Sequence, residues 1–358
     1  MEGWLTFFEF KKITNFLDAF CGTVEPSFRN AYFYYDNSLR IFATDGCAEL
    51  YLNVTKEFLP FDGVAIVPVQ YLKGIIKGTK LNDDSLVKIS VEDNEIFFEL
   101  EGMRLNSKIE KLKDYEIKDL NKDFTVLNRK KLGVFIDRMD FVSASASEGD
   151  VIDLFTVENN ILFGYICNFY KLNALFAPSK LEFHREIPFI SSRHIVKSLN
   201  LLKKNVILEF GIDKNDIILH TSGVFIRICS SQPFFKKDII IQKDNLEEKE
   251  INTRELKKAL GKLYVTFTES NIAYLVLKEN NSFIYKEEKN SKISFKLPYS
   301  FKNQYMIPIH IRKLRSILSR MSENLKICLN EKEMILLDEK QNKIASFLVQ
   351  EYKKTSGL

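Results

Sequence analysis

The chain has 358 residues, of which 45% are hydrophobic and 28% charged, a composition typical of a globular protein with two or three cores. Its net charge is only +4, and its five cysteines are odd in number and scattered, which favours reduced thiols over a secreted disulfide framework. No run of eighteen apolar residues occurs, and the first residues lack the basic region of a signal peptide, so we expect a cytoplasmic protein without a membrane span.

The first third of the chain predicts strands and two amphipathic helices. A strand over Trp4–Phe8 is followed by a helix over Phe10–Phe20 and a hairpin over Asn30–Leu50. A second helix is predicted over Pro68–Lys80, because its apolar residues recur at i, i+3 and i+4, and strand-like alternation follows over Val87–Glu110. The opposite face of this second helix carries only basic charges: Lys73, Lys77 and Lys80.

The same order of elements recurs twice more. Helices are predicted over Asn128–Val142, Ser191–Lys204, Asn252–Val265 and Pro308–Met321. The second helices of the three repeats begin at residues 68, 191 and 308, so the period is close to a third of the chain. A unit of this length is a repeated domain rather than a solenoid repeat. We therefore predict three similar domains, at residues 1–122, 123–243 and 244–358, each with the order β-α-β-β-β twice.

Charge is concentrated on the six predicted helices. They carry 21 Lys and Arg residues against four acidic residues, Asp18, Asp137, Asp140 and Glu255, so the rest of the chain is net negative. A single basic amphipathic helix is usually just a solvated face, but acid-free copies at near-equal spacing indicate a shared surface. The positive field of such a surface suits a polyanion, and contacts with its phosphates need no base-specific side chains.

Three short segments resemble one known family. Phe42–Gly46 is similar to the Ala-Thr-Asp strand end of the bacterial sliding clamp, the beta subunit of DNA polymerase III. Val67-Pro68 heads a basic helix as in that family, and Arg227–Ile240 resembles the segment that closes its second domain. The resemblance spans roughly residues 1–354. It implies an α+β DNA clamp fold of three domains, each with two basic helices backed by antiparallel sheet, and a head-to-tail homodimeric ring around double-stranded DNA.

The resemblance implies that the basic side chains of the helices contact DNA. Several family DNA contacts are replaced here by Gly22, Gln70, Asp153 and Leu154, and the neighbouring Arg29 and Lys73 are expected to substitute for them. The candidate DNA-binding residues are Lys11, Lys12, Arg29, Lys73, Lys77, Lys80, Arg129, Lys130, Arg138, Arg193, Lys197, Lys204, Arg254, Lys257, Lys258, Arg312 and Arg315.

The resemblance also implies a pocket for the clamp-binding peptides of the polymerase III catalytic subunit and the clamp loader. The turn Cys167–Leu172 stands where the family usually has Thr-Asp-Gly-His-Arg-Leu, and the tail lacks the usual Pro-Met-Arg. These departures put the peptide preference in question. The candidate pocket residues are Phe155, Cys167, Phe169, Tyr170, Lys171, Leu172, Ile240, Val349, Gln350 and Tyr352.

No residue pattern predicts catalysis, a metal or a cofactor. Gly74–Lys80 lacks the order of a phosphate-binding loop, and the four histidines are far apart without a ligand-spaced cysteine or histidine. The small, acidic segment Ser143–Asp150 is interpreted as a loop. Two hypotheses remain: a DNA-encircling processivity factor, and a protein-interaction scaffold that kept the ring fold but slides weakly. For the ring, the expected interface joins Lys73–Ile109 to Ile272–Lys296.

Overall fold

The computed structural model describes residues 2–22, 25–54, 60–111, 124–233, 247–266, 271–288 and 291–349. Within these ranges the order strand, helix, three strands occurs six times, with one additional 3-10 helix at Pro26–Arg29. This confirms the predicted order of elements. The predicted domain boundaries, after residues 122 and 243, lie outside the described residues, so the three-domain division stays a prediction.

The chain divides into two compact units. The first comprises Met1–Asp137, Ala177–Leu181 and Arg185–Gln232. The second comprises Arg138–Phe176, Glu182–His184 and Pro233–Leu358. None of the helices within the described ranges is both long and apolar enough to cross a bilayer.

The first unit is built on one twelve-stranded antiparallel sheet, in the order β1-β6-β7-β8-β5-β2-β3-β4-β16-β15-β14-β9. The pairing of β4 with β16 within this sheet, from Ala48↔Ile228 to Leu52↔Val224, joins the first and second sequence repeats. The strands are β1 (Glu2–Thr6), β2 (Asn30–Tyr35), β3 (Leu39–Thr44), β4 (Ala48–Val54), β5 (Val64–Pro68), β6 (Leu86–Glu92), β7 (Glu95–Leu100), β8 (Met103–Glu110), β9 (Thr125–Lys131), β14 (Ile207–Asp213), β15 (Asp216–Thr221) and β16 (Val224–Ile228).

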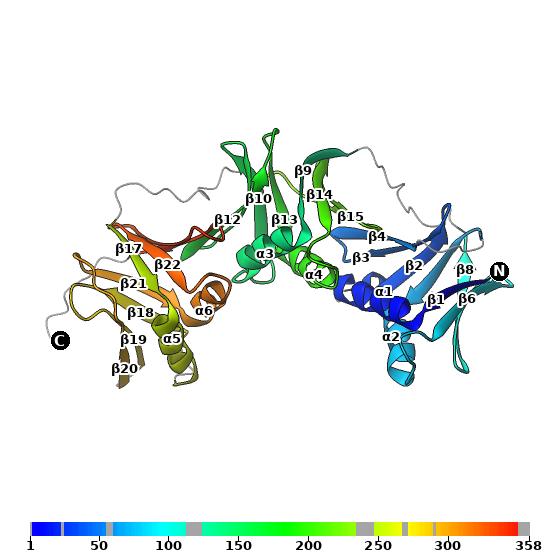
Figure 1. Ribbon diagram of the computed structural model, residues 1–358, viewed down its shortest axis with the longest axis horizontal. Helices are drawn as coiled ribbons and strands as arrows, with labels where there is room; N and C mark the ends of the chain where they lie inside the picture. The colour runs from blue at the N-terminus through cyan, green and yellow to red at the C-terminus, as the bar shows by residue number, and fades with distance from the viewer. Residues whose placement is uncertain are drawn as a thin grey trace. The chain divides into compact units, whose positions relative to one another are not determined.

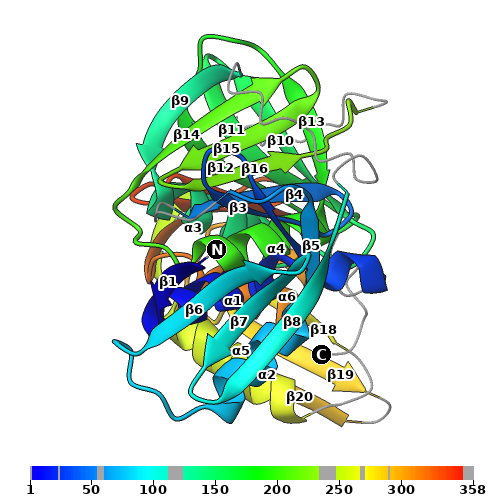
Figure 2. The ribbon, with the colours of Figure 1, turned by 90° about the vertical axis from the view of Figure 1, so that its right-hand side faces the viewer.

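Three helices of the first unit, α1 (Phe7–Phe20), α2 (Val69–Gly78) and α4 (Phe189–Leu199), lie together on one side of this sheet (Figure 1). Helix α1 contacts both of the others. Seen from the side, β6, β7 and β8 lie next to one another across α1 (Figure 2). Phe98 on β7 packs against Phe10 of α1 and Phe33 of β2, with ring centroids 6.1 and 5.2 Å apart, so an aromatic core fixes the helix on the sheet.

Two further sheets are formed mainly by residues of the second unit. An eight-stranded sheet runs β13-β10-β11-β12-β24-β23-β22-β17, and a four-stranded sheet runs β20-β19-β18-β21. The pairing of β12 with β24, from Tyr170↔Phe347 to Ala174↔Lys343, joins the second and third repeats. The strands are β10 (Val151–Val157), β11 (Asn160–Ile166), β12 (Tyr170–Pro178), β13 (His184–Pro188), β17 (Glu247–Asn252), β18 (Ile272–Leu277), β19 (Phe283–Glu288), β20 (Ser291–Lys296), β21 (Tyr305–His310), β22 (Asn324–Leu329), β23 (Glu333–Asp338) and β24 (Lys343–Leu348).

Helices α5 (Arg254–Thr266) and α6 (Ile311–Ser319) pack against each other in the second unit, and α3 (Leu132–Ser143) enters this unit at Arg138. Buried leucines and isoleucines, among them Leu260, Leu263, Ile311 and Leu314, form the inner faces of α5 and α6. Their helical spacing is the periodicity that predicts these helices from the sequence.

Five predicted helices extend beyond the observed ones, α2 for instance by Thr79 and Lys80. The predicted strand Trp4–Phe8 ends already at Thr6, because the Thr6 capping box starts α1 at Phe7. Residues Asn128–Lys131 are strand, because β9 pairs with β14, for instance Arg129↔Glu209, and this long-range ladder overrides the local helical preference. Helix α4 ends at Leu199, with Asn200 as its C-cap, so Lys204 lies in the following turn. Helix α6 begins only at Ile311, because Pro308 to His310 complete β21.

Candidate nucleic-acid interface and partner surface

The helices carry less basic charge than the sequence predicted. Within the observed bounds, Lys and Arg number two on α1, two on α2, one on α3, two on α4, four on α5 and three on α6, or fourteen on these six helices. Five acidic residues oppose them. The difference arises because Lys80, Arg129, Lys130, Lys131, Lys203, Lys204 and Arg320 lie outside the helices. Nevertheless α2, α4 and α6, the second helix of each repeat, carry no acidic residue.

The acidic residues of the helices have structural partners. Glu9 completes the capping box of α1, where its carboxylate accepts from the Thr6 backbone N–H at 2.9 Å and the Thr6 hydroxyl accepts from Glu9 N–H. Asp18 pairs with Lys73 at 2.7 Å, and Glu255 pairs with Lys258 at 2.7 Å. Lys73 and Lys258 are therefore partly neutralised before any ligand arrives. Lys11 is too, because its Nζ lies 3.0 Å from Asp83.

Other predicted DNA contacts in the first unit keep their charge available. Lys12 on α1, Lys77 on α2, and Arg193 and Lys197 on α4 are exposed, and none of them forms an ion pair with a described carboxylate. Lys80 and Lys204 are also exposed, each beyond the end of its helix, and Arg29 is an exposed residue of the 3-10 helix. Among the described residues of this unit, Lys12, Lys77, Arg193 and Lys197 are thus helix cations without an ion-pair partner.

Two predicted contacts lie on strand β9 instead of a helix. Arg129 is 67% exposed and pairs with Glu209 at 2.8 Å, and Lys130 is half-buried beside it. Arg138 is on α3 as predicted, but its Nε donates to the carbonyl of Leu175 at 2.9 Å. In the second unit Arg254 and Lys258 are exposed on α5, while Lys257, Arg312 and Arg315 line an open hollow of about 590 Å³ between α5 and α6.

The predicted peptide pocket is only partly described. Tyr170 and Leu172 lie on β12 opposite Phe347 and Ala345 of β24, so the structure does bring the 167–172 segment next to the last strand. Tyr170 is buried, its hydroxyl donates to the carbonyl of Ser145 at 3.0 Å, and burial raises its pKa. Leu172 is fully buried.

Other members of this set are more accessible. Phe169 is 57% exposed, Cys167 and Val349 are half-buried, and Lys171 lies 3.9 Å from Glu333. Phe155 is buried and packs against the His184 ring, with centroids 5.6 Å apart. Ile240, Gln350 and Tyr352 lie outside the described residues. A peptide site here stays a prediction, with Phe169 as its most exposed apolar side chain.

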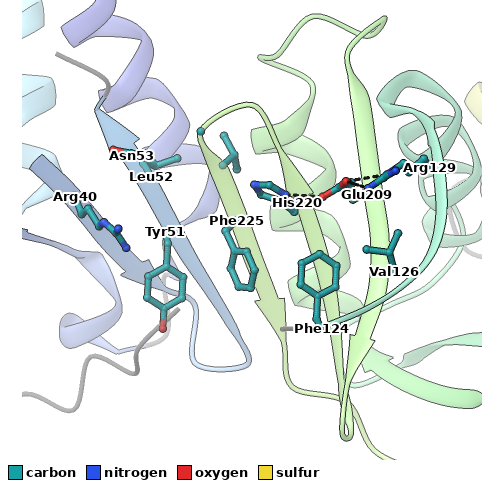
Figure 3. A pocket seen from close by; sticks show the side chains of 12 residues that line it. Arg40, Tyr51, Leu52, Asn53, Phe124, Val126, Arg129, Glu209, His220 and Phe225 are labelled. Atoms are coloured by element: carbon teal, nitrogen blue, oxygen red, sulfur yellow. Dashed lines mark hydrogen bonds and ion pairs between the residues drawn. The ribbon is translucent and has the colours of Figure 1, made fainter. Parts of the chain in front are cut away.

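An aromatic hollow of about 490 Å³ in the first unit was not predicted from the sequence (Figure 3). Tyr51, Phe124 and Phe225 line it, with Arg40 at one end and the linked side chains of His220, Glu209 and Arg129 at the other. The hydrogen bond from His220, and then that from Arg129, lower the pKa of Glu209. The hollow lies on a row of directly opposed residues across seven strands: Tyr32, Phe42, Tyr51, Phe225, His220, Glu209 and Arg129.

Solved structures with this arrangement are known. A DNA polymerase III subunit beta from Pseudomonas aeruginosa superposes with a TM-score of 0.80 at 13% identity, and the DNA polymerase III beta subunit from Thermotoga maritima with 0.82 at 11%. A Helicobacter pylori beta clamp bound to a DNA ligase peptide gives 0.75 at 11%. Each match covers 98% of this chain and 100% of the other.

Sequence comparison alone does not reach these proteins. No protein-family model matches the chain, and no curated protein matches its sequence. At 11–13% identity the likeness shows the fold, and it extends over nearly the whole chain. The resemblance noted in the sequence is thereby confirmed for the architecture: this chain has the fold of the sliding clamp, the beta subunit of bacterial DNA polymerase III.

Proposed function

We propose that the protein is a DNA sliding clamp: two copies close head to tail into a ring that encircles duplex DNA and tethers replication proteins to it. The observation that carries this proposal is the likeness to sliding clamps over 98% of the chain at a TM-score of about 0.8. In this role the protein is a non-catalytic processivity factor. Its partners are duplex DNA, a second copy of itself, and the peptides of polymerase and loader subunits.

The chemistry of the helices supports sliding. Exposed Lys77, Arg193 and Lys197 lie on acid-free helices, and long cationic side chains contact phosphates without reading bases. A closed ring is retained on DNA by its topology, so the contacts need not be tight. Weak, salt-sensitive contacts then allow movement along the duplex, since each broken phosphate contact is replaced by an equivalent one.

Tethering requires a second surface. A neighbour of this chain in fold binds a DNA ligase peptide, which supports a peptide site in the second unit. We place it at the 167–172 segment and the end of β24, with exposed Phe169 in contact with the peptide and Lys171 beside it. The polymerase III catalytic subunit and the clamp loader are the proposed sources of the peptides.

The test is retention on circular and linearised DNA. The protein is loaded onto nicked circles by its cognate loader, or by mass action at high protein concentration, and separated from free protein by gel filtration at moderate salt. Retention on circles with loss after linearisation is the expected result, because a ring escapes only over an end. Equal, salt-sensitive loss from both forms contradicts sliding. Together with an intact ring, that loss would favour the scaffold hypothesis.

A further inference from the structure

The hollow between α5 and α6 combines two arginines with one tyrosine. The guanidinium carbons of Arg312 and Arg315 lie 5.2 and 4.7 Å from the centroid of the Tyr264 ring, within cation–π distance. Tyr264 comes from the last turns of α5, and both arginines come from α6. Lys257 on α5 and the hydroxyl-bearing Ser316 and Ser319 complete the lining. The hollow therefore holds three cations on two packed helices.

Within the part of the chain that the structure describes, no acidic side chain neutralises these three cations. Among the described residues, no carboxylate forms an ion pair with Lys257, Arg312 or Arg315. Their neighbours differ: Lys258 pairs with Glu255, and Arg320 pairs with Asp140 at 2.6 Å. This contrast within a few residues shows that the hollow retains positive charge where adjacent positions do not.

The local field is unfavourable without an anion. Arg312 lies in the first turn of α6, next to the positive end of the helix dipole, and the N-cap residue His310 makes no side-chain capping bond. Burial, and then the charges of Lys313 and Arg312, lower the pKa of His310. Positive charge at the N-terminus of a helix is destabilising, because it lies next to the positive end of the helix dipole. Locally unfavourable arrangements of this kind are typical of functional sites.

The tyrosine restrains the arginines. A free arginine loses side-chain entropy when it binds, but guanidinium groups already held against a ring lose less. Planar guanidinium forks match the geometry of phosphate oxygens, whereas a lysine acts as a point charge. The α5–α6 hollow is thus a better-organised anion site than the separate Lys12, Lys77 and Lys197 of the first unit.

We propose that this hollow binds a phosphodiester of the DNA backbone, and that Tyr264 is the positioning residue that aligns Arg312 and Arg315 on it. The inference rests on the proposed sliding function for the identity of its ligand. It goes beyond that function because it assigns unequal shares to the basic helices. One site per chain grips the backbone, while the exposed lysines contribute a diffuse field.

The experiment measures binding of the full-length protein to a short linear duplex over a range of salt concentrations. The test variants are Arg312→Ala/Arg315→Ala and Tyr264→Leu. The matched control is Lys332→Ala/Lys340→Ala, which removes two exposed basic residues of the second unit that are not among the candidate DNA-binding residues. Tyr264→Phe keeps the ring and is expected to bind like the wild type. Circular dichroism melting confirms that each variant is folded.

The arginine double variant and the control double variant each remove two positive charges from the wild type. We expect the arginine variant to reduce the slope of log K against log[salt] by roughly two phosphate contacts, about 1.8, with little change in the control. Tyr264→Leu, which changes no charge, should weaken binding about fivefold because both cation–π contacts are lost. If Tyr264 merely supports the fold, Tyr264→Leu would lower the melting temperature without a selective loss of DNA binding.

If the arginine pair and the control pair lose DNA affinity equally, the inference is overturned, since a diffuse positive field predicts equal losses. Unchanged binding by Tyr264→Leu would overturn the positioning role. Either outcome leaves the sliding proposal intact if the wild type is retained on circles. Conversely, the wild type could bind the linear duplex through the hollow but dissociate from circles and from linear DNA at equal rates. That result would refute sliding and leave the phosphate site supported.

Discussion

At the scale of single residues, Asp45 connects a turn to a helix of the next repeat. Its Oδ1 accepts from the backbone N–H groups of Cys47 and Ala48, at 2.9 and 2.7 Å, and its Oδ2 lies 2.9 Å from Nδ1 of His194 on α4. The carboxylate is buried, so the protein replaces all of its water contacts. These contacts give Asp45 a structural role at the end of the strand Leu39–Thr44.

Replacing Asp45 by alanine should therefore destabilise the first unit. Two backbone donors and His194 would be left without their acceptor in a buried site, and we expect a loss of about 3 kcal/mol in the free energy of unfolding. Urea unfolding followed by tryptophan fluorescence measures it, since Trp4 is the single tryptophan and lies on β1. Asp36→Ala is the control, because Asp36 is exposed and its carboxylate makes only an ion pair with Arg40 and a hydrogen bond from Asn37 at the surface. Similar losses for both variants would contradict this role.

At the scale of elements, α1 shows how a helix on a basic surface keeps an acidic residue. Thr6 and Glu9 cap its first turn reciprocally, and a negative charge there also favours the helix dipole. Thr6→Ala should cost about 1 kcal/mol, whereas Thr6→Ser retains the hydroxyl and should cost little. Hydrogen exchange of the α1 amides reports the difference locally. If exchange in α1 were the same in both variants, the cap would not be what holds the helix start.

The elements also show what the sequence could reveal. The order of strands and helices was predictable in all three repeats because helical periodicity and polar turns are local signals. The sheet pairings were not: β4 meets β16 and β12 meets β24 across long sequence distances, and these ladders convert residues 128–131 from predicted helix into strand. Arg129 consequently lies on a sheet.

The candidate site was likewise predictable where it depends on local sequence signals and not where it depends on contacts between elements. The basic residues of α2, α4 and α6 were identified correctly as lying on helices, because their spacing relative to the apolar face is a property of the sequence. Tyr264 was missed. Nothing in α5 alone marks it, and only the packing of α5 on α6 brings its ring to Arg312 and Arg315. Ion pairing, which separates Lys73 from Lys77, likewise depends on contacts between elements.

At the scale of the whole molecule, the proposed ring needs sheet edges that pair between two copies. Strand β20 is an outer strand of the four-stranded sheet. Strand β8 pairs with β5 only through Glu110 and Ile109, so residues 103–108 are paired with β7 on one side. Open edges of this kind favour pairing with another strand. Both lie in the regions that the sequence indicated for the dimer interface, and we propose that β20 of one copy meets β8 of the other.

This arrangement predicts that a proline in β20 separates dimerisation from folding. Neighbouring residues in a strand point their N–H groups to opposite sides of the strand. Of the two variants Ile293→Pro and Ser294→Pro, one therefore removes a donor that points inward to β19, and the other removes a donor that points outward, away from β19. The inward variant breaks the ladder with β19 and should lower the melting temperature. The outward variant should keep it but weaken dimerisation about tenfold, the equivalent of one lost hydrogen bond. Light scattering after gel filtration measures the mass, which for the wild type should be twice 41.7 kDa. Two folded variants that both remain dimers would place the ring interface elsewhere, because a strand that lost its outward donor could not continue the sheet across the seam.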